Sequence, residues 1–197
     1  MSVIRRFGYV SLLLCLTAVY SFAQQDKPFN WSLALQNVKS GESVPFSAPV
    51  QAKTGDKYRL VIQPQADCFC YVIYESPGGE DVAVIHAGPL KSEGIWYSSV
   101  LELTAPRGAE SLFVVVSRDE QKTLAQRAAA LNNNAGSSQK RALKNEIFRI
   151  RSDASKFKEA AEKPVLMGGA SRGTPEKSQG VEYSGLGIYV KTVSIEH

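Results

Sequence analysis

Short segments of alternating apolar and polar residues, each bounded by turn residues, constrain the fold of this chain most. WSLALQNV at residues 31–38, KYRLVIQP at 57–64 and SLFVVVS at 111–117 are the clearest of them. Segments of this length and pattern predict β-strands. SPGGED at residues 76–81 predicts a tight hairpin turn, because glycine accepts the positive φ angles that such turns need. Strands at this spacing predict an antiparallel β-sandwich or a partly open barrel.

The hydrophobic period becomes helical after Ser117. Ser117 and Glu120 fit a capping box for a first helix. A second, longer helix is predicted from near Ser138 to Pro164, because one apolar stripe repeats every three or four residues through Leu143, Ile147, Ile150, Ala154, Phe157 and Ala161. The helical excursion therefore covers about residues 118–163.

A Gly-rich loop is expected over about residues 168–180, and the alternating residues 187–197 predict a last strand that returns to the sheet. The fold class expected is mainly β, with two helices inserted before the last strand. Gly168–Gly173 (GGASRG) lacks the spacing of a nucleophile elbow or a phosphate-binding loop. No cofactor is predicted.

The first 23 residues have the pattern of a secretory signal peptide. Arg5 and Arg6 precede an apolar run at residues 9–20, and small residues precede an expected cleavage after Ala23. The run is shorter than the roughly 20 apolar residues that span a bilayer, although a retained anchor stays open. We therefore expect residues 24–197 to form one exported domain with no integral membrane span, in the periplasm or at the cell surface.

Net charge gives little indication of a nucleic-acid partner. The whole chain carries +4, and Arg5 and Arg6 supply two of its 23 basic residues against 19 acidic ones, so residues 24–197 are near +2. The predicted long helix is the locally basic element, with eight Lys or Arg against four Asp or Glu over residues 138–163. Such a face is either simply solvated or a contact for an anionic partner.

Cys68 and Cys70 stand two positions apart in a predicted strand and are the main candidates for chemistry. Side chains at this spacing share one face, with α-carbons about 6.6 Å apart. A disulfide needs β-carbons roughly 3.5 to 4.5 Å apart, so a bridge would require a local bulge. We expect two reduced, buried thiols. A disulfide, or a redox or metal site that includes His86 of the neighbouring strand, stays open.

Two segments resemble the bacterial domain of unknown function 4384. GDKYRLVIQPQADCFCYVIYESPGGEDVAVI, residues 55–85, is similar to its opening strands and glycine hairpin, and APRGAESLFVVVS, residues 105–117, to its Pro-x-Gly-x-Glu strand. The resemblance covers roughly Val44 to Leu131. It implies a free-standing, exported bacterial module and no established activity.

These observations predict an exported, non-enzymatic domain that binds an envelope protein or polymer. No nucleic-acid partner and no convincing catalytic or metal-binding constellation is predicted. The alternative is a thiol-redox or metal-dependent enzyme that uses Cys68, Cys70 and His86.

Overall fold

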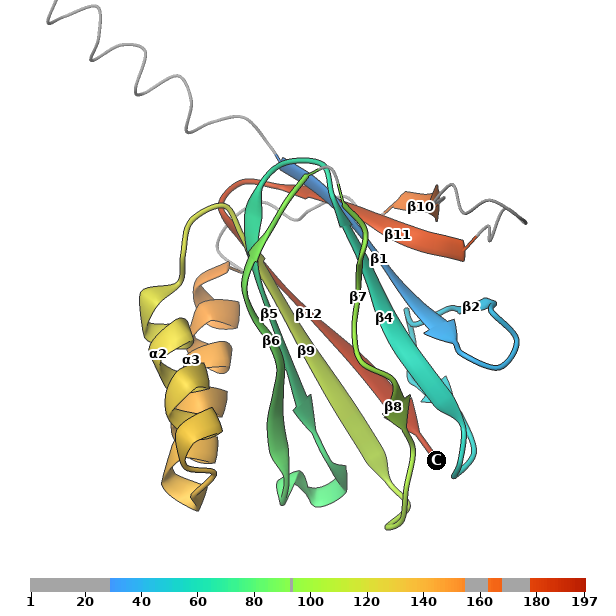
Figure 1. Ribbon diagram of the computed structural model, residues 1–197, viewed down its shortest axis with the longest axis horizontal. Helices are drawn as coiled ribbons and strands as arrows, with labels where there is room; N and C mark the ends of the chain where they lie inside the picture. Colours follow the sequence, from blue (N-terminus) through green and yellow to red (C-terminus); the bar gives the residue numbers. More distant parts are fainter. Residues whose placement is uncertain (1–28, 93, 155–162, 168–177) are drawn as a thin grey trace, which may run out of the picture.

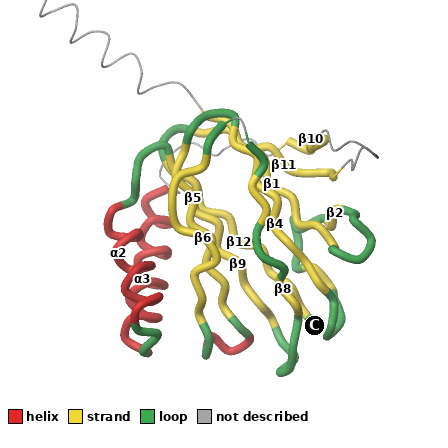
Figure 2. The backbone as a smooth tube through the Cα atoms, in the orientation of Figure 1, coloured by secondary structure: helices red, strands yellow, loops and turns green. Residues whose placement is uncertain are grey.

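The computed structural model describes residues 29–92, 94–154, 163–167 and 178–197, and these residues form two β-sheets and two helices. The sheets pack face to face, and both helices lie on the outer face of one sheet (Figure 1). Figure 2 shows the helical layer on one side of the strands. Of the two expected architectures, the β-sandwich is confirmed. The predicted signal peptide and its cleavage after Ala23 lie outside the described residues.

Seven strands make the first sheet: β1 Phe29–Asn37, β2 Ser43–Val44, β4 Lys57–Pro64, β7 Trp96–Tyr97, β8 Leu101–Glu102, β10 Lys163–Met167 and β11 Ser178–Gly185. Their hydrogen-bonded order is β10-β11-β1-β4-β7, while β2 pairs with β1 and β8 pairs with β4. All of these pairs are antiparallel. β1 and β4 therefore form the centre of this sheet.

Five strands make the second sheet: β3 Val50–Gln51, β5 Cys68–Glu75, β6 Val82–Leu90, β9 Ala109–Ser117 and β12 Ile188–Glu196. Their order is β3-β12-β9-β5-β6. The predicted antiparallel sandwich has one parallel pair, since β3 runs parallel to β12. The chain reaches β3 by crossing from the first sheet, so no hairpin forces the two strands to run in opposite directions.

The predicted hairpin turn is confirmed between β5 and β6. A short 3-10 segment, η1 (Pro77–Gly79), makes the turn, with φ of 76° at Gly78 and 74° at Gly79. These angles lie in the left-handed region that favours glycine. The two glycines therefore allow a turn that other residues would strain.

Two apolar clusters lie on opposite faces of the second sheet. The first fills the sandwich interior, where Trp31 is 1% exposed and stacks on Tyr183 with ring centroids 4.6 Å apart. The second lies between the sheet and the helices and includes Tyr71, Ile73, Phe113, Val115, Leu124, Leu143, Ile147 and Ile150. Burial of this apolar area, worth about 25 cal/mol per Å², attaches the helical layer to the sandwich.

The helices are α2 (Lys122–Asn133) and α3 (Ser137–Ala154), which begin and end inside the predicted excursion. The predicted capping box is wrong, since the Ser117 hydroxyl donates to the carbonyl of Asp119 and α2 starts only after Gln121. The buried Tyr71 hydroxyl of β5 accepts the Gln121 N–H at 3.1 Å. A tertiary contact thus satisfies a backbone donor at the helix start.

The segment after α3 differs from the sequence expectation. Lys163 and Pro164 belong to β10, not to a helix, and Ser178–Gly180 belong to β11, not to a Gly-rich loop. Gly180 pairs with Val165 in this strand, and its lack of a β-carbon leaves room for the Met167 side chain. Three described strands, not one, therefore follow the helices. Residues 155–162 and 168–177, which include Phe157, Ala161 and GGASRG, lie outside the described residues.

Neither described helix is long and apolar enough to cross a membrane.

Candidate functional site

Cys68 and Cys70 lie in the sandwich interior as free thiols, 2% and 0% exposed. Burial, with a smaller contribution from the Asp67 charge, raises the pKa of Cys68 to about 11. Burial and the neighbouring Cys68 raise the pKa of Cys70 well above its ordinary value. Because the thiolate is the reactive form of cysteine, both sulfurs are poorly placed for redox or nucleophilic chemistry.

The β5–β6 pairing is regular along the two cysteines. Cys68 lies opposite Leu90 and Cys70 opposite Gly88, and the only register shift recorded between these strands falls after Val72. The bulge that a Cys68–Cys70 bridge would need is therefore not at the cysteines. The extended strand keeps the two sulfurs on one face without joining them.

His86 does not complete a site with the cysteines. It lies opposite Val72 on β6, and its ring contacts Trp96 with centroids 5.0 Å apart. Burial lowers the pKa of His86, partly offset by a hydrogen bond with the Gly88 backbone. The described residues contain no group of three or more His, Cys, Asp or Glu side chains that could hold a metal ion.

A groove lies between α3 and the β5–β6 turn, on the opposite face of the second sheet from the cysteines. We call it the α3 groove. Its volume is about 520 Å³, within the range of roughly 300 to 1,000 Å³ typical of ligand pockets. Its lining residues are Gly79 and Glu80 from the turn and Ser137, Lys140, Arg141, Lys144, Asn145 and Phe148 from α3.

Helical periodicity explains why α3 presents two different stripes. Residues three or four positions apart share a face of a helix. Leu143, Ile147 and Ile150 point to the sheet and are buried, whereas the groove residues from Ser137 to Phe148 occupy the adjoining stripe. The same 18-residue helix therefore contributes both to the core and to the groove.

Two ion pairs hold the walls of the α3 groove together. Lys140 donates to the Glu80 carbonyl at 2.5 Å and pairs with Asp81 at 3.2 Å. Lys144 pairs with Glu75, whose side chain is only 14% exposed. The Lys144–Glu75 pair is partly buried and is therefore screened less by salt than a surface pair, whereas the Asp81 side chain of the other pair is 81% exposed. The turn is therefore fixed against α3 by charge as well as by packing.

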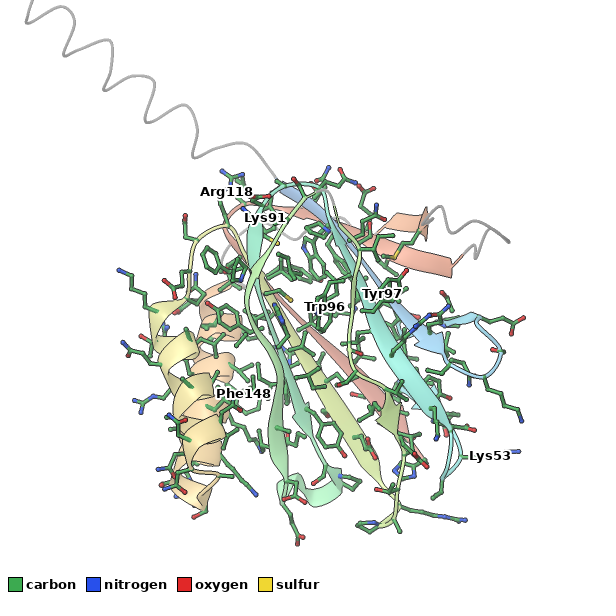
Figure 3. The ribbon with its side chains drawn as sticks, viewed as in Figure 1. Lys53, Lys91, Trp96, Tyr97, Arg118 and Phe148 are labelled. Carbon is green, nitrogen blue, oxygen red and sulfur yellow. The ribbon has the colours of Figure 1, made fainter. Side chains whose placement is uncertain are left out.

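The α3 groove also contains an exposed aromatic ring and an exposed guanidinium. Phe148 is 47% exposed, and its ring meets the buried Phe113 edge-on with centroids 6.0 Å apart. Figure 3 shows Phe148 on α3 beside the sheet. Arg141 is exposed and has no ion pair within the described parts of the chain. The groove thus offers an anion contact and an apolar contact on one helix.

A second polar cluster joins the C-terminal residue to β9. His197 Nε2 lies 3.0 Å from Glu110 Oε1, and the two side chains are 0% and 2% exposed. The Thr54 hydroxyl lies 3.3 Å from His197 Nδ1. Burial and the charge of the same Glu110 raise the pKa of Tyr74 to about 12. Two backbone hydrogen bonds between His197 and Gly108 complete the contact. These contacts of His197, the residue after β12, hold the end of that strand against β9.

Sequence reasoning identified the basic helix but not the groove. The described α3 retains five of its basic residues, and three of them line the groove. The available signal was a second stripe, Lys140, Arg141, Lys144 and Phe148, beside the apolar one. What the sequence alone does not show is that the acidic hairpin turn 75–81 lies against that stripe.

No family model, curated protein or solved structure matches the chain. The resemblance to the bacterial domain of unknown function 4384 stays a prediction from the sequence.

Proposed function

We propose that this chain is an exported, non-enzymatic binding domain, at work in the periplasm or at the cell surface, and that the α3 groove is its binding site. The observation that carries the proposal is the groove itself, about 520 Å³ in volume and lined by three cationic side chains and the exposed Phe148. Concave sites with a few convergent polar groups are the usual place for a ligand or partner segment. An envelope protein or polymer with anionic groups fits this lining.

The burial of both thiols favours binding over the alternative of a thiol-redox or metal-dependent enzyme. Catalytic cysteines lie in partly exposed, electropositive surroundings that lower the thiol pKa. Cys68 and Cys70 have the opposite environment, since apolar burial raises the pKa of both. Thiol titration with metal analysis tests the alternative. Two thiols that react rapidly in the folded protein, or one bound metal per chain, would favour the enzyme.

The binding proposal is tested by retention from a bacterial envelope extract on immobilised residues 24–197. The groove variant is Arg141→Glu. Its matched control is Arg127→Glu, the same charge change at an exposed arginine of α2. We expect the wild type and Arg127→Glu to retain the same protein or polymer, and Arg141→Glu to lose it. Retention that is absent, or equal in all three, contradicts the proposal.

A further inference from the structure

We propose that the α3 groove binds a small aromatic molecule that carries a phosphate, with the ring on Phe148 and the phosphate among Lys140, Arg141 and Lys144. This inference rests on the proposed function, because it names the ligand class of the same site. The four side chains line one groove and come from one helix, so their arrangement is fixed by the helix itself.

The cations of the groove retain unused hydrogen-bond donors. A lysine ammonium has three N–H donors and an arginine guanidinium has five. Within the described residues, Lys140 uses its donors on the Glu80 carbonyl and Asp81, and Lys144 on Glu75. Counted against the described residues, one ammonium donor of Lys140 and two of Lys144 are left, together with those of the exposed Arg141. A phosphate, with several terminal oxygens, matches such converging donors better than a single neutral acceptor does.

Carboxylates of the hairpin turn compete with the ligand phosphate for the cations of the α3 groove. Their positions decide which cations remain available to the phosphate. Glu75 and Asp81 each neutralise a lysine, but neither lines the groove. Glu80 is the one acidic residue among the lining residues, which also include Lys140, Arg141 and Lys144. The two ion pairs neutralise Lys140 and Lys144, so the cation that an entering phosphate meets is Arg141, which has no ion pair within the described residues. Removal of the Glu80 charge strengthens the attraction further.

Phe148 supplies a rigid platform for the ring of the ligand. Nearly half of its surface is open, while the edge-on contact with the buried Phe113 fixes its orientation. A ring held in this way loses little freedom when a second ring stacks on it. Stacking of a base on an aromatic side chain contributes about five- to a hundredfold in affinity.

The spacing along α3 gives the length of the ligand. Arg141 and Phe148 are seven residues apart, which is about 10 Å at the helical rise of 1.5 Å per residue. The ligand must therefore separate its ring from its terminal phosphate by a linker. Adenosine diphosphate has this form, since ribose and the first phosphate stand between the adenine and the terminal phosphate. We use it as the probe.

The test compares three probes by calorimetry on residues 24–197 in low-salt buffer without divalent cations. Adenosine diphosphate is expected to bind with a Kd below about 1 mM. Adenosine lacks the phosphates and pyrophosphate lacks the ring, so each is expected to bind at least about tenfold more weakly. Equal binding of adenosine diphosphate and pyrophosphate would show that the ring makes no contact and overturns the inference.

Three variants locate the two halves of the ligand. Phe148→Ala is expected to reduce adenosine diphosphate binding to the pyrophosphate level, and Arg141→Glu to weaken both phosphate probes about tenfold. Glu80→Gln is expected to tighten both about threefold, a gain that a misfolded protein could not produce. Tyr97→Ala, at an exposed aromatic of β7, is the matched control and leaves all three affinities unchanged.

Competition separates this inference from the proposed function. If adenosine diphosphate releases the envelope component retained through Arg141, both are supported. If the component is retained in a groove-dependent way but no aromatic phosphate binds, the ligand class is wrong and the binding function stands. If the probe binds with the expected variant pattern and nothing is retained from envelopes, the ligand class stands and the envelope partner is wrong.

Discussion

The two faces of β5 have opposite chemical roles, although their residues alternate along a single strand. Cys68, Cys70 and Val72 point into the sandwich, where they pack among apolar side chains. Tyr71 and Ile73 point to the helical layer that forms the α3 groove. The face with the more reactive residue type is the one closed to solvent. Burial, rather than residue type, therefore decides which face of this strand is available for function.

The two faces also differ in what a substitution should disturb. The sandwich interior is filled by tightly packed apolar side chains, so changes there alter the free energy of unfolding. The α3 groove is open and lined mainly by polar and charged side chains. Changes there should alter binding more than stability, since surface substitutions are usually within about 0.5 kcal/mol.

The largest effect is expected for Trp31→Ala in the sandwich interior. Trp31 is 1% exposed and stacks on Tyr183, so truncation leaves a large cavity between the sheets. We expect the free energy of unfolding to fall by about 3 to 5 kcal/mol in urea titrations. Leu186→Ala, at a site 46% exposed, is the control and should change it by less than about 0.5 kcal/mol. A loss below about 1 kcal/mol for Trp31→Ala would contradict the packing described.

The next effect concerns thiol reactivity as a function of pH. Burial raises the pKa of Cys68 from 9.0 to about 11, which lowers its thiolate fraction about a hundredfold near neutral pH. A disulfide reagent should therefore react slowly with the folded protein at pH 8 and rapidly after urea unfolding. The stability that the protonated thiol contributes is fully present below pH 9 and is lost as pH rises toward about 11. Rapid reaction of the folded protein at pH 8 would place the thiols at the surface.

Cys70→Ser tests the same interior by polarity instead of by volume. Cys70 is fully buried in the apolar cluster, so a hydroxyl there would be taken out of water and placed among apolar side chains. We expect a loss of about 1 to 3 kcal/mol in the free energy of unfolding. Cys70→Ala is the comparison, and it should cost less than Cys70→Ser although alanine is the smaller residue. The reverse order would mean that the site is polar.

The difference between the two faces was only partly predictable from the sequence. Alternation predicted that Cys68 and Cys70 share a face, because the period of two is a local property of any strand. The strands at residues 178–185 and 163–167 were missed because tertiary contacts, such as the close approach of Gly180 to Met167, override local turn signals. The α3 groove was missed for the same reason: its two walls are some 60 residues apart, and the Lys140–Asp81 pair exists only in the folded chain.

The smallest effect is expected for alanine substitutions at the two neighbouring glycines of the β5–β6 turn. Comparing the two variants separates the cost of backbone strain from the effect on the α3 groove. Gly78 and Gly79 have nearly the same φ, 76° and 74°. Alanine at either position should therefore cost about 1 to 2 kcal/mol through the left-handed backbone. A β-carbon at Gly78 meets nothing within 4 Å, whereas one at Gly79 would lie 2.6 Å from Glu75 Oε1 and 3.3 Å from Lys144 Nζ.

Gly79→Ala must consequently displace the Lys144–Glu75 pair, while Gly78→Ala leaves it in place. Both atoms are at the ends of flexible side chains, so the extra loss of stability should be below about 1 kcal/mol. Adenosine diphosphate binding should nevertheless weaken in Gly79→Ala alone, because Lys144 moves within the α3 groove. Calorimetry with the two variants side by side measures this. If both variants bind the probe equally well, Lys144 makes no contact with the phosphate, and the contact is limited to Lys140 and Arg141.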